Sequence, residues 1–166
     1  QEEHEGATTD LFELGKWDMP GIQSNILSIA VSEQFVYIIT KTGDVVRWSI
    51  GNSESLTQSY SLPTSKSQPS SAPEHLTKIF CDRKGNHAII KHGGRMYYFN
   101  GGSLSIKELP SLKGIEVYAV AFDEKNTNPK ETGEILISDY ENKIYCYHIE
   151  LQGGKPTDGI CELIQL

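Results

Sequence analysis

The chain repeats one pattern of strands and turns three times. Each copy consists of a short apolar strand, a turn, a second apolar strand, a tight polar turn and a third strand that carries aromatic residues. The copies span residues 26–50, 76–99 and 116–151. Their spacing of roughly 50 residues is typical of repeats that bury their apolar faces against one another in propellers and arrays. The pattern therefore predicts an all-β fold in which each copy is one blade of a β-propeller.

A fourth, more polar strand follows each triplet and completes a four-stranded antiparallel blade. The three blades then cover about residues 26–62, 76–110 and 115–166. Because three blades are too few to close a ring, we expect a partial β-propeller with two open, apolar blade faces. The predicted tight turns are Gly43-Asp44, Gly93-Gly94 and Glu141-Asn142, and the predicted outer strands are 55–62, 103–109 and 160–166.

The central strands of the three copies are apolar without alternation. Residues 35–39, 88–90 and 135–137 are β-branched or aromatic runs bounded by turn residues, which predicts strands that are buried on both faces. In the third strand of the first copy, Val46, Trp48 and Ile50 share one face and Arg47 and Ser49 share the other. The aromatic residues Trp48, Tyr98 and Tyr147 are interpreted as one repeated position that fills the space between blades.

Three segments lie outside this repeat. Residues 1–25 form an acidic, polar tail in which 11–14 is interpreted as a stray strand given to a neighbouring blade. Residues 63–75 form a polar loop rich in Ser and Pro, and residues 124–133 lengthen the first turn of the third blade. The loop at 63–75 is either a phosphorylated or partner-recruiting segment or a tolerated surface insertion. The second interpretation is favoured because long surface loops cost little stability.

Charge and cysteine usage restrict the partners and the compartment. The 166 residues carry 15 Lys and Arg against 22 Asp and Glu, a net charge of −7. Nucleic acid and anionic membranes are therefore disfavoured as partners. No apolar stretch approaches the roughly 20 residues that span a bilayer, so no direct membrane insertion is expected. The three cysteines lack C-x-x-C spacing, which favours a reducing, cytoplasmic compartment. Residue 1 is Gln, so we expect the chain to begin inside a longer gene product.

The usual signatures of catalysis are missing from the sequence. None of the five histidines has the i, i+4 helical spacing of a zinc site, although His87 and His92 could meet across a blade end. The sequence contains no G-x-S-x-G elbow, Walker loop or G-x-G-x-x-G fingerprint. Asp82 and Asp123 repeat at the ends of first strands, where Ser32 is the equivalent, and are expected to tie the following turn. We therefore predict no catalytic, cofactor-binding or metal-ligating residue.

The second copy resembles a known family. Its segment 76–90 follows the pattern hydrophobic-x-x-Asp-x-x-Gly-x-His-hydrophobic of the deep orange family, the vacuolar protein-sorting-associated protein 18 family. The matching positions are Asp82, Gly85 and His87, which we take as the structural family motif. The polar insertion before Gly133 and the strand 135–137 are also similar to that family, and the resemblance runs from about residue 26 to 151.

This resemblance implies a tethering subunit that is not an enzyme. Members of the family carry an N-terminal β-propeller, an α-solenoid and a RING-type zinc module, and they form the core of the HOPS and CORVET complexes. The resemblance implies as partners the other tethering-complex subunits and, through the whole complex, Rab GTPases or SNAREs. It implies a peripheral location on late endosomes and on the vacuole or lysosome. No residue of this chain inherits the chemistry of the RING module.

Two other interpretations stay open at the level of sequence. The chain could be a generic WD40-like propeller scaffold of another intracellular complex, or a propeller enzyme whose active site needs further blades. Open blade faces also predict self-association, for instance two copies that form a pseudo-closed ring of six blades.

Overall fold

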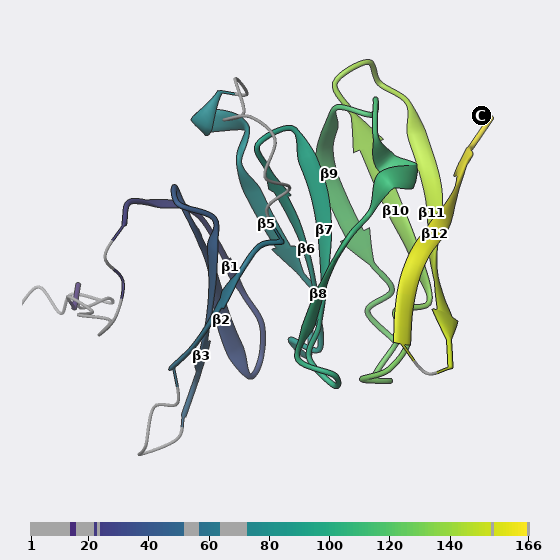
Figure 1. Ribbon diagram of the computed structural model, residues 1–166. Helices are drawn as coiled ribbons and strands as arrows, with labels where there is room; N and C mark the ends of the chain where they lie inside the picture. Colours follow the sequence, from purple (N-terminus) through teal and green to yellow (C-terminus); the bar gives the residue numbers. More distant parts are fainter. Residues whose placement is uncertain are drawn as a thin grey trace, which may run out of the picture.

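Three four-stranded antiparallel sheets make up the described part of the chain. The computed structural model describes residues 14–15, 22, 24–51, 57–63, 73–153 and 155–165. In each sheet the strands are neighbours in chain order, and Figure 1 shows the sheets standing side by side. This arrangement confirms the prediction of an all-β partial β-propeller with three blades.

Each blade is formed by one continuous stretch of sequence. Blade 1 contains β1 (Ile26–Val31), β2 (Phe35–Thr40), β3 (Asp44–Ser49) and β4 (Thr57–Ser61). The short 3₁₀ helix η1 (Glu74–Leu76) precedes blade 2, which contains β5 (Lys78–Cys81), β6 (His87–His92), β7 (Arg95–Asn100) and β8 (Ser105–Glu108). A second 3₁₀ helix, η2 (Pro110–Leu112), leads to blade 3, which contains β9 (Val117–Phe122), β10 (Glu134–Asp139), β11 (Ile144–Gln152) and β12 (Lys155–Leu163).

The three tight turns lie where the sequence places them, but only one is a two-residue turn. Gly93 and Gly94 have φ angles of 60° and 76° and connect the paired residues His92 and Arg95, as a primed two-residue turn requires. At the first turn Asp44 already belongs to β3, and the Gly43 N–H donates to the Thr40 carbonyl at 3.0 Å. Three residues, 41–43, therefore form this turn, which ends one residue earlier than predicted.

The third turn is also longer than two residues. Four residues, 140–143, connect β10 and β11, and the Asp139 N–H donates to the Lys143 carbonyl at 3.1 Å. Asn142 adopts a φ of 64° within this turn. Asparagine tolerates this left-handed conformation better than most residues, which explains how the turn forms without glycine.

Two apolar clusters hold the blades together. Between blades 1 and 2, Tyr37, Ile39 and Val45 pack against residues that include Ile90 and Phe99. Between blades 2 and 3, the cluster of buried residues is Ile89, Met96, Tyr98, Leu109, Leu112, Val117, Ile135, Ile137, Tyr147 and Ile149. Successive residues of β6 face opposite neighbours, which confirms that its strand 88–90 is buried on both faces.

The register of the strand pairs shows that one member of the predicted aromatic repeat is wrong. Trp48 pairs with Val36, Phe99 pairs with Ala88, and Tyr147 pairs with Ile135. Each of these three partners also pairs with the first strand of its blade, at the residue directly before the repeated polar position. The polar positions are Ser32, Asp82 and Asp123, and the partners are Val36, Ala88 and Ile135 in the same order. Phe99, not Tyr98, is therefore the equivalent of Trp48 and Tyr147. Tyr98 is buried as predicted but faces blade 3, because adjacent strand residues point to opposite faces.

The two outer faces of the array differ, which corrects the expectation of two open apolar faces. On blade 1, Val36, Ile38 and Val46 are buried, and Ile22 and Trp48 pack against them. On blade 3, Leu136 is 47% exposed and Ile160 is 53% exposed. The prediction that 135–137 is buried on both faces is therefore wrong at Leu136, since no other described sheet lies beyond blade 3.

The remaining sequence predictions fall partly outside the described residues. Of the proposed stray strand 11–14, only Leu14 is described, and it belongs to no strand. In the polar loop, residues 64–72 are outside the description, and the loop ends in η1. The division into a tail at 1–25 and a propeller at 26–166 stays a prediction. Across the described ranges, no helix has the length and hydropathy needed to cross a membrane.

Candidate functional site

Asp82 organises the turn that joins the first two strands of blade 2. Its side chain is buried after β5, and Oδ1 accepts hydrogen bonds from the N–H groups of Gly85 at 3.1 Å and His87 at 2.9 Å. In the equivalent turn of blade 1, Ser32 Oγ accepts from the Phe35 N–H at 2.9 Å. In blade 3, Asp123 Oδ1 accepts from the Lys125 N–H at 3.0 Å. These bonds confirm that the repeated polar position ties the following turn.

Gly85 lies where the turns of blades 1 and 2 come close to each other. Its φ is 84°, and a Cβ atom at this position would lie 2.3 Å from Ser32 Oγ. The Tyr37 hydroxyl donates to the Gly85 carbonyl from the opposite blade. Burial, opposed in part by the charge of Arg47, raises the pKa of Tyr37, so this hydroxyl remains a donor at neutral pH. Only glycine fits this place without displacing the facing turn.

His87 connects blade 2 to the insertion of blade 3. The side chain is 1% exposed, Nε2 lies 2.8 Å from the Asn128 carbonyl oxygen, and Nδ1 lies 2.6 Å from the Tyr98 hydroxyl. Because a carbonyl oxygen only accepts, Nε2 carries a proton, and in the neutral ring Nδ1 accepts from Tyr98. Both ring nitrogens are thus occupied by structural hydrogen bonds, which leaves neither free to transfer a proton to a substrate.

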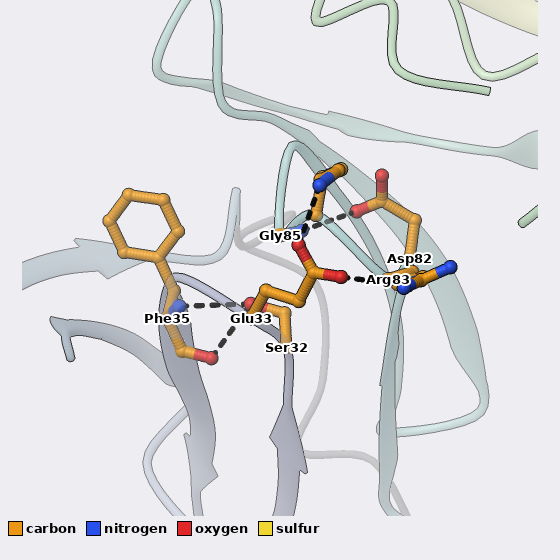
Figure 2. Close-up of polar contacts among 7 residues, drawn as sticks. Ser32, Glu33, Phe35, Asp82, Arg83 and Gly85 are labelled. Carbon is orange, nitrogen blue, oxygen red and sulfur yellow. Dashed lines mark hydrogen bonds and ion pairs between the residues drawn. The ribbon is translucent and has the colours of Figure 1, made fainter. Parts of the chain in front are cut away.

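The family-motif positions therefore meet at one end of the blades, which we call the Asp82 end. Figure 2 shows Glu33 of blade 1 reaching across to the turn of blade 2. Its carboxylate accepts from Lys84 Nζ at 2.6 Å and Arg83 Nε at 2.7 Å, and these bonds lower the pKa of Glu33. Exposed ion pairs of this kind contribute little stability. They instead connect the β1–β2 loop of blade 1 to the β5–β6 loop of blade 2 at the surface.

The other predicted chemical groups do not gather. His87 and His92 lie at opposite ends of β6, which corrects the expectation that they could meet. His92 Nε2 lies 3.2 Å from the Lys41 carbonyl oxygen, His75 and His148 are exposed, and His4 lies outside the described residues. Within the described ranges no group of three His, Cys, Asp or Glu residues could hold a metal ion.

The three cysteines are free thiols. Burial, with a smaller contribution from Asp82, raises the pKa of Cys81 to about 12. Burial is also the largest cause of the raised pKa of Cys161 and of Cys146. A raised pKa disfavours the thiolate, which is the reactive form of cysteine, so these side chains behave as small packing residues.

A polar contact between η2 and blade 3 was not predicted from the sequence. Asp158 in β12 accepts hydrogen bonds from the Ser111 N–H at 2.7 Å, the Ser111 hydroxyl at 2.6 Å and the Tyr147 hydroxyl at 2.9 Å. Burial opposes ionisation, but these hydrogen bonds, led by that of the Ser111 hydroxyl, leave the pKa of Asp158 lowered. The pair Asp158-Gly159 within an otherwise strand-like segment was the available signal, because glycine inside a strand often marks a bulge.

The sequence also matches a known family over most of its length. Residues 10–160 match the family described as the Pep3/Vps18/deep orange β-propeller domain. The chain belongs to this family. Membership in the Pep3/Vps18/deep orange family indicates a module of a vacuolar sorting tethering subunit, and propellers of this family are generally non-catalytic scaffolds. The resemblance proposed from residues 26–151 is thereby confirmed, whereas the motif at Asp82, Gly85 and His87 stays a prediction.

Three solved structures have a similar arrangement of strands. HIRA(644-1017) is 18% identical with a TM-score of 0.46, covering 75% of this chain and 36% of the HIRA chain. Apo AztD from Citrobacter koseri is 13% identical with a TM-score of 0.49, covering 82% of this chain and 34% of AztD. Saccharomyces cerevisiae Sqt1 is 10% identical with a TM-score of 0.47, covering 85% of this chain and 36% of Sqt1.

The chain thus spans about a third of the length of these solved chains. A search of curated proteins finds no match to this chain.

Proposed function

We propose that this chain is a non-catalytic protein-interaction module of a HOPS/CORVET-type tethering subunit. Such a subunit would act in endosome-to-vacuole or lysosome trafficking and in vesicle fusion. The observation that carries the proposal is the family match over residues 10–160. The interpretation as a generic scaffold of another complex has no comparable observation in its favour.

The fold offers a physical mechanism for this role. The turns at the Asp82 end are held by hydrogen bonds within each blade and between blades, through Asp82, Tyr37 and His87. Loops that are ordered before a partner arrives lose less conformational entropy on binding. We therefore propose that the propeller docks through its blade-end loops and blade edges as a preformed surface.

The described polar clusters support a role without catalysis. Asp82, His87 and Asp158 each bind groups of neighbouring turns or blades. A catalytic acid or base must reach the proton of a substrate, and here the acceptor and donor positions are used within the fold.

The partners follow from the tethering role. We propose direct contact with other subunits of the complex, and indirect contact with Rab GTPases or SNAREs through the whole assembly. The location would be cytoplasmic and peripheral, on late endosomes and on the vacuole or lysosome. We also propose that residues 26–166 form the propeller module and that the polar loop 63–75 is a surface insertion.

Reconstitution tests this proposal. The purified chain is mixed with each purified subunit of a HOPS or CORVET complex and analysed by size-exclusion chromatography. We expect co-elution with at least one subunit, and we expect the chain fused to a fluorescent protein to concentrate on late endosomal or vacuolar membranes. Failure to co-elute with any subunit, together with a diffuse distribution in cells, would contradict the tethering role.

A further inference from the structure

Two recesses flank the Gly93-Gly94 turn, at the end of the blades opposite Asp82. The first, the Lys91 recess, has a volume of about 240 Å³ and is lined by Leu76, Thr77, Lys91 and Glu116, among others. The second, the Met96 recess, has a volume of about 300 Å³. Both glycines line both recesses. In Figure 1 the β6–β7 turn that carries them lies at the upper edge of the sheets, as does the β10–β11 turn.

Lys91 is a buried cation at the boundary between blades 2 and 3. Its side chain is 5% exposed, and Nζ donates to Glu116 Oε2 at 3.1 Å and to the Val117 carbonyl at 3.0 Å. An ammonium group has three N–H donors; these two bonds use two of them, and Nζ also lies over the Tyr140 ring, 5.3 Å from its centroid. The Glu116 side chain is 68% exposed whereas Lys91 is buried, so Glu116 can leave Lys91 for solvent only when another carboxylate takes its place. A second carboxylate that entered the recess would find a desolvated positive charge.

The Met96 recess offers an apolar floor. Met96, Leu109 and Leu112 line it, and each is nearly or fully buried in the cluster between blades 2 and 3. Arg95 and Lys113 also line the recess, and Glu108 lies 3.7 Å from Arg95. This combination of an apolar floor and a charged rim suits an aliphatic side chain on a polar backbone.

Local charge at the two recesses is opposite to that of the whole chain. Their lining includes three cations, Lys91, Arg95 and Lys113, and two carboxylates, Glu108 and Glu116, which leaves a charge of +1 on a chain of net charge −7. Complementary charge favours an acidic ligand here. The two glycines between the recesses carry no side chains, so a peptide backbone can cross the turn closely.

We propose that the two recesses form one binding site for a short, extended peptide segment of a partner protein. An acidic group of the peptide enters the Lys91 recess and accepts a hydrogen bond from Lys91 Nζ in place of Glu116, while an aliphatic side chain enters the Met96 recess. Each recess is no larger than the small end of the range for small-molecule sites, about 300 Å³, so each suits one side chain rather than a cofactor.

A carboxylate fits this site better than a phosphoryl group. The Lys91 recess contains a single lysine and no arginine among its lining residues, and Glu116 stands beside that lysine. A phosphoryl group carries a charge of about −1.5 to −2 and prefers arginine clusters, so it would be repelled by Glu116 and incompletely neutralised. The acidic group is therefore an Asp or Glu side chain or a peptide C-terminus.

The test uses the purified chain and capped, fluorescein-labelled peptides. In the series, one glutamate and one leucine are separated by one to four serines, and matched peptides replace the glutamate by glutamine, by phosphoserine or by a free C-terminal carboxylate. We expect saturable anisotropy changes for at least one spacing. We expect Lys91→Met to weaken binding about tenfold or more, because it removes a buried charged partner. We expect the double variant Arg95→Glu and Lys113→Glu to weaken binding as well.

Lys107→Met is the matched control for Lys91→Met, since it removes one positive charge outside both recesses. A thermal denaturation curve verifies that each variant is folded. The proposal is overturned if no carboxylate peptide binds, if only the phosphoserine peptide binds, or if Lys91→Met and Lys107→Met bind equally well. This inference rests on the proposed function as an interaction module. Co-elution with a tethering subunit but no peptide binding would remove only this site, whereas failed co-elution with retained peptide binding would remove only the tethering role.

Discussion

At the scale of single residues, Gly85 shows how one atom can decide the approach of two blades. The residue combines a φ of 84° with contact to Ser32, Phe35 and the Tyr37 hydroxyl. The Asp82 carboxylate stabilises the same turn by accepting hydrogen bonds from two backbone N–H groups. The turn is thus specified by a glycine for shape and a carboxylate for hydrogen bonding, and both requirements can be tested separately.

Gly85→Ala should lower the free energy of unfolding by about 2–4 kcal/mol, the sum of a left-handed backbone penalty and of overpacking against Ser32. Gly114→Ala is the matched control, because Gly114 has a φ of 86° but nothing within 4 Å of the added Cβ. The control should cost only about 1 kcal/mol, the backbone term alone. Urea denaturation measures both variants. Equal losses would show that the approach of the blades at Gly85 is not tight.

Asp158 predicts a dependence of stability on pH. Its pKa is lowered in the folded state from the ordinary 3.8, so its contribution is present above that value and is lost as the pH falls through the folded pKa. Asp158→Asn should therefore cost about 1 kcal/mol at neutral pH, after allowance for solvent screening, and less in acid. Urea denaturation at a series of pH values from 7 downward gives the difference between the two proteins. A difference that stays constant below pH 4 would contradict this assignment.

At the scale of elements, the insertion of blade 3 is an ordered part of the interface with blade 2. Asparagine side chains hold it internally: Asn126 Oδ1 accepts from the Asn128 N–H at 3.0 Å, and Asn128 Oδ1 accepts from the Lys130 N–H at 2.9 Å. The Asn128 carbonyl then accepts from His87 of blade 2. A segment that appears from its composition to be only a loop thus completes the hydrogen bonding of a buried histidine.

The double variant Asn126→Ala and Asn128→Ala should loosen this insertion and weaken its bond to His87. We expect a loss of about 1–2 kcal/mol, because the ring nitrogen of a buried histidine loses part of its pairing. Hydrogen–deuterium exchange should rise over residues 124–133 and at His87. Thr127→Ala, an exposed position in the same segment, should leave exchange unchanged. Unaltered exchange in the double variant would mean that other contacts order the insertion.

The outermost strand of blade 3 begins and ends earlier than the sequence predicts. We expected it at 160–166, but β12 begins at Lys155 and contains Pro156, Asp158 and Gly159. Proline and an Asp-Gly pair are typical of loops when read locally. Here the pairing of β11 and β12 shifts register between Ile149 and Leu151, and the irregularity admits these residues at a sheet edge.

At the scale of the whole molecule, the two ends of the array present different surfaces. Ile22 and Trp48 pack on the outer face of blade 1, whereas Leu136 and Ile160 of blade 3 are half exposed. A pseudo-closed ring of two copies would need both faces free, so the structure does not favour it. Contact between the blade 3 faces of two copies remains the form of self-association that these exposed side chains predict.

Leu136→Lys combined with Ile160→Lys should abolish this self-association, since both residues lie on one face of the sheet and charges there would repel each other. Multi-angle light scattering over a range of concentrations measures the mass. Leu104→Lys is the control, because Leu104 is an exposed apolar residue in a turn of blade 2. A wild-type chain that is monomeric at every concentration would rule out the contact.

Part of the candidate site could be predicted from the sequence because it is a local pattern in blade 2. Asp82, Gly85 and His87 were visible as a local pattern, and the turn-tying role of Asp82 follows from its place after a strand. The contacts of Tyr37, Asn128 and Asp158 could not be assigned, because each has a partner that is distant along the chain. The distances along the chain are 48 residues from Tyr37 to Gly85, 41 from His87 to Asn128 and 47 from Ser111 to Asp158.

The sequence by itself determined the fold class, the number of blades and the family, because these depend on local strand patterns that recur at a regular spacing. Only the tertiary structure decided which aromatic residues are equivalent, which outer face is covered and where the recesses lie beside Gly93 and Gly94. These properties depend on how blades pack and on strand register. A shift of one residue moves a side chain to the opposite face, and such a shift leaves no trace in the local sequence.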